Sequence, residues 1–289
     1  PKRLGRYELL DRLGKGGMGI VYLARDTKLD RPVAVKMLLG DLERDDETRE
    51  RFIREARAAG ELNHRNIIQI YDFGEDGGRA FIVMELLEGA NLNEVLKERP
   101  DLALDRKLQI MTGVCEGLAF SHSRSIIHRD LKPANILVGG FGEVIVLDWG
   151  LAKVWGEPDV GIEPFPAKAN PVLTPAGRRY GTPLYMAPEL ARGDAQIDGR
   201  ADVFSLGNIL FEMLTLGQLL SGATAREVAD NLLNQPLPKP SEAAPDRDIP
   251  PGLETICRKA LEKEKRARYP SVQAMLEALR AYRLSGDGM

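Results

Sequence analysis

A short polar run between two apolar segments, at residues 126–138, constrains the fold more than any other feature of the sequence. The pair Ile126-Ile127 leads into a His, an Arg, an Asp, a Lys and an Asn within eight positions, and the apolar residues 136–138 follow. Polar residues packed this densely between hydrophobic segments indicate a site held on a rigid base. The alternative is a charged turn that faces water.

The order of these residues, H-R-D-L-K-x-x-N, resembles the catalytic loop of eukaryotic-type (Hanks-type) serine/threonine protein kinases. The resemblance implies that Asp130 is the base that accepts the proton of the substrate hydroxyl, and that Asn135 is a metal ligand. Lys132 stands two positions after the aspartate, as in Ser/Thr kinases, and would meet the γ-phosphate of ATP. One segment does not establish a kinase, so the other kinase motifs must be found in the rest of the chain.

The length, net charge and cysteine content of the sequence limit the classes of protein to which it can belong. A length of 289 residues allows one large domain or two lobes with a cleft between them. The formal charge of −3 gives no basic surface typical of nucleic-acid binding. Cys115 and Cys257 are far apart and, with three histidines, form no zinc pattern, which fits a reducing compartment. We therefore expect a cytoplasmic protein.

The hydropathy of the chain and its first residue lead to two further expectations, on membrane contact and on the length of the whole protein. No run of about 18 apolar residues predicts a membrane span, and no signal peptide is visible. We therefore expect no membrane contact from this segment. The chain begins at Pro1 without a Met, so we expect a piece of a longer protein.

A glycine-rich stretch, residues 14–19, lies between the strand-like segments 7–13 and 20–24, and with Val21 it reads G-x-G-x-x-G-x-V. A dinucleotide-binding fold needs a helix directly after such a stretch, but here another strand follows. Glycines let the backbone approach an anion and donate N–H groups to it, so this tip can fold over phosphates. A flexible hairpin tip is the alternative.

Lys36 ends the apolar segment V-A-V-K. A lysine at a strand end is often only a solvated tip, but the resemblance implies a ligand of the α- and β-phosphates, positioned by a helix glutamate. Residues 46–62 show apolar residues at helical spacing, and Glu55 borders their face. The resemblance implies that Glu55 is the partner of Lys36. The alternative is a surface pair worth only ~0.3 kcal/mol.

Residues 67–72 and 80–86 read as strands joined at Gly77-Gly78, which gives a small lobe of five strands and one helix. Residues 85–89 read as the connector to a second lobe. The resemblance implies a gatekeeper at Met84, an adenine edge held by backbone groups, and apolar residues on the faces of the ring. The ATP-binding residues that it implies are Leu13, Gly14, Lys15, Gly16, Gly17, Met18, Gly19, Val21, Ala34, Lys36, Met84, Glu85, Leu87 and Leu137.

The apolar segment 144–147 ends in Asp148-Trp149-Gly150, where the kinase pattern has D-F-G. A carboxylate at Asp148 suits a divalent cation that bridges the β- and γ-phosphates. The resemblance thus implies that Asp148 and Asn135 hold Mg²⁺ or Mn²⁺.

Trp149 is the one departure from this motif. Our hypothesis is that Trp149 stacks with His128, Ala59 and Ile70 in the active form, where the small Ala59 leaves room for the larger ring. The departure leaves the balance between active and inactive forms open.

Residues 151–186 read as a proline-rich loop, which is long for a compact domain and so is either functional or disordered. It ends in G-T-x-x-Y-x-A-P-E, residues 181–189, which resembles the end of a kinase activation segment. The resemblance implies that Thr182 supports the catalytic residues, which leaves Thr174 as the phosphoacceptor and Arg129 as the cation that captures its phosphate. An unmodified threonine in a loose loop is the alternative.

The last two thirds of the chain read as mainly helical. The expected helices are residues 91–98, 105–123, 200–216, 252–263 and 271–283, with a proline-rich connector at 236–251. In the kinase pattern Asp202 tethers the backbone of the catalytic loop, and Arg268 pairs with Glu189. Residues 217–223 lack the usual G-x-x-P-F, which leaves the substrate-docking surface open.

The resemblance covers residues 7 to about 283 and implies an α+β, bilobal protein kinase fold. Residues 1–87 would form the β-rich small lobe with the hinge, and residues 88–289 the larger helical lobe. The catalytic set that it implies is Asp130, Lys132, Lys36, Glu55, Asn135 and Asp148.

The expected activity is the ATP-dependent phosphorylation of Ser/Thr residues on proteins in bacterial signal transduction, with autophosphorylation. The expected partners are protein substrates and not nucleic acid, and a homodimer stays open. Two rivals remain: a pseudokinase, which keeps the fold as a binding scaffold, and a small-molecule kinase of related fold.

Overall fold

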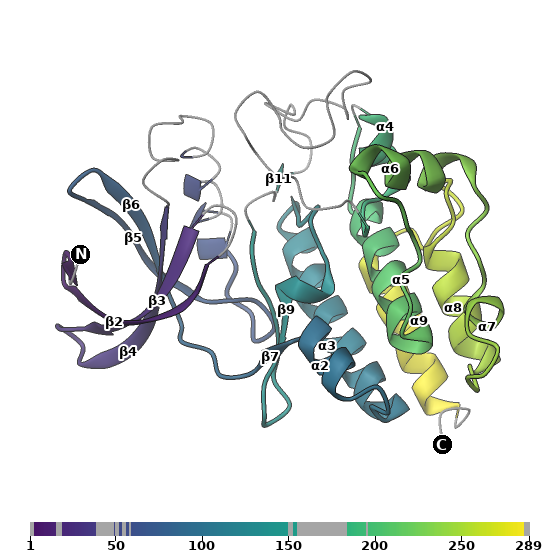
Figure 1. Ribbon diagram of the computed structural model, residues 1–289, viewed down its shortest axis with the longest axis horizontal. Coiled ribbons are helices and arrows are strands. Elements are labelled where there is room, and N and C mark those ends of the chain that lie inside the picture. The colour runs from purple at the N-terminus through teal and green to yellow at the C-terminus, as the bar shows by residue number, and fades with distance from the viewer. Residues whose placement is uncertain are drawn as a thin grey trace.

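A computed structural model gives the structure of the chain. It describes residues 3–15, 19–38, 49, 52–53, 56–57, 59–149, 153–154, 184–194 and 196–285. Figure 1 shows a curled sheet at the N-terminal end and a larger group of helices at the C-terminal end, with short strands between them. This is the α+β, two-lobed arrangement that the sequence predicts.

The small lobe is one antiparallel sheet with the strand order β1-β2-β3-β4-β6-β5. Its strands are β1 (Arg3–Leu4), β2 (Tyr7–Lys15), β3 (Gly19–Asp26), β4 (Arg31–Leu38), β5 (Ile70–Asp76) and β6 (Arg79–Met84). The expected five strands are thus six, because β1 is only two residues long and pairs through Leu4 with the start of β2. The strand expected at residues 67–72 begins only at Ile70.

Alternation along β4 decides where Lys36 lies. Successive side chains of a strand point to opposite faces. Val33 and Val35 are wholly buried in one apolar cluster, and Leu38 is buried in another. Lys36 shares the face of Leu38, so it lies on the face opposite the Val33–Val35 cluster. The turn before β6 takes Gly77 and Gly78 at φ of 58° and 79°, which glycine adopts without strain.

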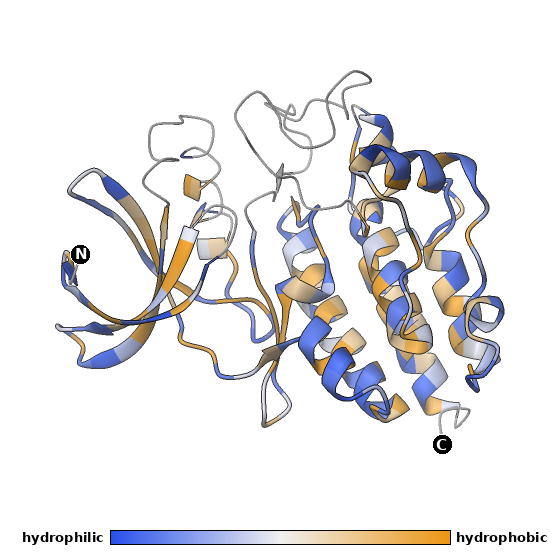
Figure 2. Cartoon of the chain, viewed as in Figure 1, coloured by the Kyte–Doolittle hydropathy of each residue, from blue (hydrophilic) through white to orange (hydrophobic). Residues whose placement is uncertain are grey.

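The large lobe is built from helices α2 to α9. They are α2 (Leu92–Glu98), α3 (Leu104–Ser123), α4 (Pro188–Arg192), α5 (Arg200–Thr215), α6 (Ala225–Asn234), α7 (Pro240–Ala243), α8 (Pro251–Ala260) and α9 (Val272–Leu284). Helix α5 is buried on nearly all sides, as its uniformly apolar sequence predicts. Figure 2 shows this helix largely in orange, whereas α2 at the edge of the lobe alternates orange with blue.

Two expectations about this lobe need correction. The connector expected at residues 236–251 contains the short helix α7, which begins at Pro240 because proline suits a first helical turn. Helix α8 ends at Ala260 rather than at residue 263. Helix α6 was not foreseen, although Thr224 and Glu227 have the spacing of a capping box and the Glu227 N–H donates to the Thr224 hydroxyl.

Short strands lie between the lobes and hold the central polar run. They are β7 (Ala90–Asn91), β8 (Ile126–Ile127), β9 (Ile136–Val138), β10 (Val144–Val146) and β11 (Lys153–Val154), with the 3₁₀ turn η1 (Pro133–Asn135). Strand β10 is also bonded to the segment before β5: the N–H of Ile68 donates to Val146 O at 3.1 Å, and the N–H of Val146 donates to Asn66 O at 2.9 Å. Within the described ranges, no helix has the length and apolar character that crossing a membrane requires.

Candidate active site between the two lobes

The polar run after β8 is fixed by one buried carboxylate. Asp202, in the first turn of α5, is wholly buried and accepts the backbone N–H groups of His128 and Arg129, each at 2.9 Å. Arg129 has a φ of 68°, in the left-handed region that non-glycine residues rarely adopt. The carboxylate therefore holds a backbone conformation that would otherwise be unfavourable. This confirms the expected tether.

Asp202 has a further partner that the sequence did not reveal. His122 Nε2, at the end of α3, lies 2.7 Å from Asp202 Oδ2. A Cβ on Gly199 would lie 2.5 Å from His122 Nδ1, so only glycine admits the imidazole here. Burial by itself raises the pKa of Asp202, but the hydrogen bond and charge of His122, with the other donors, lower it below its usual value.

Three predicted catalytic side chains converge in the next turn of the chain. Lys132 Nζ lies 2.6 Å from Asp130 Oδ2, and both side chains are about one third exposed, at 34% and 36%. The amide nitrogen of Asn135 donates to Asp130 O at 2.9 Å, which leaves the amide oxygen of Asn135 for another partner. The turn thus presents a carboxylate, an ammonium and an amide oxygen within a few residues.

Two further predicted residues face each other across the lobes. Lys36 Nζ, from β4, lies 3.6 Å from Asp148 Oδ1. Asp148 follows β10 and has a φ of 60°, again in the left-handed region. Burial by itself raises the pKa of Asp148, but the charge of Lys36 and then those of nearby cations outweigh it and lower the pKa. Asp148 is therefore held as a carboxylate.

The imidazole of His128 links the turn at Asp130 to the segment that leads to Asp148. His128 Nδ1 accepts the N–H of Asp130 at 3.3 Å, and His128 Nε2 lies 3.0 Å from Leu147 O. This pattern requires the tautomer that carries its proton on Nε2, which donates to the carbonyl. The N–H of Leu147 in turn donates to Asn135 O at 2.8 Å. The turn at Asp130 and the residue before Asp148 are thereby locked together.

Trp149 fills the position that phenylalanine has in the kinase pattern. It is wholly buried, and its ring centroid lies 4.8 Å from that of His128 at an interplanar angle of 57°. It belongs to the same buried cluster as Ala59, against which Ile70 packs. His128 is thus a neighbour of Trp149, as predicted, but the two rings are tilted rather than stacked, and the link to an active form stays a prediction. Within the described part of the chain, its indole Nε1 is buried without a hydrogen-bond partner.

Most of the expected ATP-binding residues belong to the described part of the chain, on strands of the small lobe, directly after β6 and on β9. Val21 lies opposite Lys36 in the β3–β4 register, and Ala34 lies opposite Met84 between β4 and β6. The remaining described ones are Leu13, Gly14 and Lys15 at the end of β2, Gly19 at the start of β3, Glu85 and Leu87 after β6, and Leu137 on β9. A Cβ on Gly19 would lie 2.4 Å from Met37 O, so this close approach of strands requires glycine.

The segment after β6 is fixed by Glu85. Its N–H donates to Gln69 O at 3.0 Å, and its Oε1 accepts the N–H of Gln69 at 2.7 Å. Because the backbone N–H of Glu85 donates to Gln69, only the backbone carbonyl of Glu85 is left for the adenine edge that the kinase resemblance implies here.

Some predicted residues lie outside the described ranges. These are Gly16, Gly17, Met18, Glu55, Thr174 and Thr182. Arg129, the expected phosphate-binding cation, is itself described and is only 8% exposed beside Asp130.

The predicted pair of Glu189 and Arg268 is confirmed. The two nitrogens Nη1 and Nη2 of Arg268 each lie 2.7 Å from an oxygen of Glu189, and the side chains are 0% and 2% exposed. The other donors of Arg268 bind the backbone carbonyls of Glu262, Lys263 and Arg200. All five N–H donors of the guanidinium are satisfied, as a buried charge requires.

The donor set fits a hard divalent cation that is bound jointly with phosphates. Across the described ranges, no three His, Cys, Asp or Glu side chains gather as a metal site. The carboxylate of Asp148 is an oxygen ligand, and so is the amide oxygen of Asn135, which has no hydrogen-bond partner among the residues that the structure describes. Mg²⁺ is usually held by one or two such protein ligands plus substrate phosphates.

Comparison with known proteins gives one consistent family. The family model "Protein kinase domain" matches residues 7–279. A probable serine/threonine-protein kinase of Streptomyces coelicolor is 39% identical over 95% of this chain, and serine/threonine-protein kinase PknD of Protochlamydia amoebophila is 34% identical over 96%. The chain spans only 40% and 30% of the lengths of these two relatives.

A solved structure agrees with these sequence relatives. The kinase domain of Mycobacterium tuberculosis PknI has a TM-score of 0.71 to this chain, is 25% identical to it and covers 96% of it, with 96% of its own length matched. With the motif residues in place between the lobes, the chain belongs to the protein kinase family, as a protein serine/threonine kinase domain of the bacterial type.

Proposed function

We propose that this chain is the catalytic part of a longer protein and transfers the γ-phosphoryl group of ATP to Ser and Thr hydroxyls of protein substrates. Kinases of this family use ATP and a divalent metal ion in general. The observation that carries the proposal is that two charged pairs are linked to each other. In one pair Asp130 lies 2.6 Å from Lys132, and in the other Lys36 lies 3.6 Å from Asp148. His128 bonds to both segments.

The roles of the residues follow from charge. The transferring phosphoryl group carries negative charge on its oxygens, so positioning and neutralisation supply most of the catalysis. Lys36 would bind the α- and β-phosphates, and Lys132 would contact the γ-phosphate. Asp130 would accept a hydrogen bond from the incoming hydroxyl and orient it. The 2.6 Å contact between Lys132 and Asp130 supports this assignment, because it places a cation beside the base.

The metal that we propose is Mg²⁺, with Mn²⁺ as a substitute, held by Asp148 and Asn135. When bound, it supplies positive charge between the β- and γ-phosphate oxygens. The lowered pKa of Asp148 supports the assignment, because the carboxyl is ready as an anionic ligand at neutral pH. Activity measured against each metal in turn, with EDTA-treated protein as the baseline, tests this choice.

Regulation remains a proposal from the sequence. We propose that Thr174 is autophosphorylated, that Arg129 binds its phosphate, that Thr182 supports Asp130, and that Glu55 pairs with Lys36. Mass spectrometry after incubation with ATP should find phosphate on Thr174. Full activity of Thr174→Ala would remove this part of the proposal and leave the catalytic assignment intact.

We also propose a division of labour, a location and a set of partners. Residues 1–87 would form the nucleotide-binding lobe and residues 88–289 the substrate-binding lobe. The two cysteines are free and buried, which supports work in the reducing cytoplasm. The proposed partners are proteins and not nucleic acids. A homodimer stays a prediction, which light scattering of the purified chain tests.

Transfer of labelled phosphate from ATP to a generic protein substrate tests the central claim. Asp130→Asn keeps the shape of the side chain and removes the base, so the rate should fall by ~10²–10⁴-fold, the usual worth of acid–base catalysis. Binding of ATP to Asp130→Asn should survive. A wild-type protein that binds ATP but transfers no phosphate under any metal or phosphorylation state would instead be a pseudokinase.

A further inference from the structure

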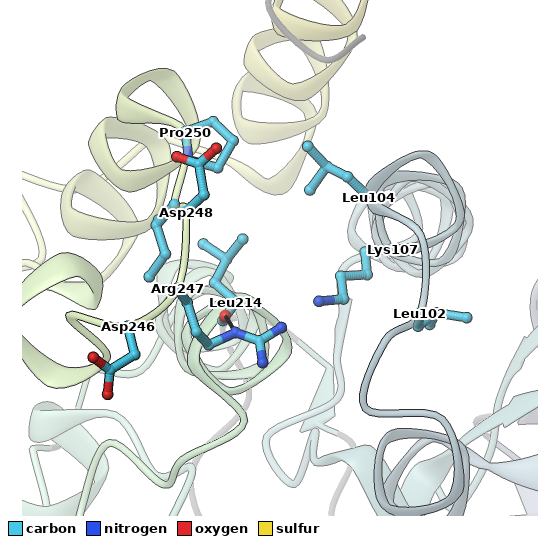
Figure 3. A pocket seen from close by; sticks show the side chains of 9 residues that line it. Leu102, Leu104, Lys107, Leu214, Asp246, Arg247, Asp248 and Pro250 are labelled. Carbon is cyan, nitrogen blue, oxygen red and sulfur yellow. Dashed lines mark hydrogen bonds between the residues drawn. The ribbon is translucent and has the colours of Figure 1, made fainter.

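A pocket lies at the end of the helical lobe that is remote from Asp202, where α3 begins, α5 ends and the α7–α8 connection passes (Figure 3). We call it the basal pocket. It has a volume of about 300 Å³, and five of the nine residues that line it are apolar. These are Leu102, Leu104, Leu214, Ile249 and Pro250. Leu214 is 12 residues beyond Asp202 on α5, so the pocket lies ~18 Å along this helix from the catalytic loop.

Two cations meet in the basal pocket. Lys107, on α3, is only 6% exposed, and nothing in the described part of the chain forms an ion pair or hydrogen bond with its ammonium group. Arg247, from the α7–α8 connection, donates from Nε to Leu214 O at 2.8 Å. Figure 3 shows the Lys107 ammonium and the Arg247 guanidinium pointing toward one another across the pocket.

A structural role explains only part of this arrangement. Arg247 Nε satisfies one of the last carbonyls of α5, which is an ordinary use of arginine at a helix C-terminus. That role does not use the two outer nitrogens of Arg247, Nη1 and Nη2. It also does not explain why the largely buried side chain of Lys107 faces a second positive charge. Burial, and then the charge of Arg247, lower the pKa of Lys107, which is the direction expected for a cation whose charge no nearby carboxylate compensates.

The carboxylates near the pocket do not supply that compensation. Asp246 and Asp248 also contribute to its lining, but both are exposed to solvent. Their carboxylates point away from the gap between the two cations (Figure 3). Within the described residues, neither of them forms a salt bridge with Lys107 or Arg247. Two like charges that face each other repel, and an anion between Lys107 and Arg247 would replace this repulsion by attraction to both.

We propose that the basal pocket binds a small organic anion, with its charged head between Lys107 and Arg247 and its short apolar body against Leu102, Leu104 and Leu214. A volume of about 300 Å³ is at the lower end of ligand pockets and suits a body of a few carbons. The planar guanidinium can bind a carboxylate or a phosphate through two parallel hydrogen bonds. Both heads share this chemistry, and the experiment separates them.

Calorimetric titration of the 289-residue chain with four probes tests the proposal. Hexanoate and hexyl phosphate carry both a charged head and an apolar body, inorganic phosphate carries only a head, and hexanol only a body. At least one of the two amphiphilic anions should bind more tightly than inorganic phosphate and hexanol, and the tighter of the two identifies the head. If hexanol binds as well as both anions, or neither anion binds, the proposal is wrong.

Variants tie the binding to the pocket. Lys107→Met keeps the apolar stem and removes the charge, so affinity for the better anion should fall by at least ~10-fold, the worth of one charge-assisted hydrogen bond. Lys28→Met removes an exposed lysine of the small lobe and should leave affinity unchanged. Arg247→Gln keeps a donor for Leu214 O and provides a second test should Lys107→Met fold poorly. Wild-type affinity in both pocket variants would overturn the assignment.

Discussion

Charged residues inside the helical lobe are held differently from charged residues that lie between the two lobes. Inside the helical lobe, Arg268 and Glu189 are buried and fully bonded, and Asp202 accepts three hydrogen bonds. Between the lobes, Lys36 and Asp148 keep 15% and 36% of their side chains exposed at a separation of 3.6 Å. Asp202 holds the backbone at His128 and Arg129, and the Arg268–Glu189 pair joins α4 to the segment before α9. The Lys36–Asp148 contact is partly open to solvent, as we expect of side chains that we propose to bind phosphates and a metal ion.

Replacement of Arg268 gives the largest expected effect on stability. Arg268→Met leaves Glu189 buried without its cation, so the free energy of unfolding should fall by about 3–5 kcal/mol. Urea unfolding followed by circular dichroism measures it. Arg266→Met removes an exposed neighbour and should change stability by no more than about 0.5 kcal/mol. Equal losses in the two variants would contradict the contrast between buried and open charges.

Replacement of Lys36 should show the opposite pattern. Lys36→Met removes a positive charge that we assign to the phosphates, so kcat/KM should fall by ~10²–10³-fold, as for loss of one preorganised electrostatic contact. Its pair with Asp148 is partly exposed, so the free energy of unfolding should change by less than about 1 kcal/mol. A loss of stability as large as that of Arg268→Met would break the comparison between the two regions.

The Asp202 tether should be visible in the pH dependence of stability. Asp202→Asn lacks one acceptor oxygen for the N–H groups of His128 and Arg129 and for His122, so it should lose about 1.5–3 kcal/mol at pH 7. The folded pKa of Asp202 is lowered. An unfolded aspartate titrates near ~3.9, so the contribution of the carboxylate is complete above about pH 5 and declines below about pH 4.

The difference in unfolding free energy between wild type and Asp202→Asn should therefore shrink as the pH falls below about 4. Urea titrations at several pH values between 7 and 3 measure this difference. A gap that stays constant over the whole range would show that the ionised form of Asp202 is not what holds the loop.

Trp149 gives the smallest expected effect. Trp149→Phe removes ring volume from a closed site but also removes a buried indole N–H that has no partner in the described residues. These two effects oppose one another, so we expect a net loss of stability of only about 1 kcal/mol, with a measurable change in kcat. Unchanged melting temperature and unchanged activity would show that the site is not fitted to tryptophan.

Three of the proposed catalytic residues lie close together in sequence, whereas two elements of the lobes around them, α6 and β1, are not part of the expected fold. Asp130, Lys132 and Asn135 lie within six positions, so a local turn brings them together, and chemistry fixes their types. Helix α6 left a visible signal in Thr224 and Glu227, which the reading of the sequence overlooked. Strand β1 left almost none, because two residues that pair with a neighbouring strand have no periodicity to detect.

Contacts between residues far apart in the sequence could not be predicted from the sequence. His122 lies 80 positions from Asp202, and no local pattern distinguishes it from an ordinary helix residue. Lys107 and Arg247 likewise meet only because α3 and the α7–α8 connection pass the same end of α5.

The sequence by itself determined the family of motifs, their order and the chemistry of each side chain, because residue type and short spacing suffice for these. The tertiary structure alone decided which charges are buried and which partners they have. Burial and pairing depend on the packing of segments far apart in sequence, and they set whether a charge is held inside the fold or stays open to solvent.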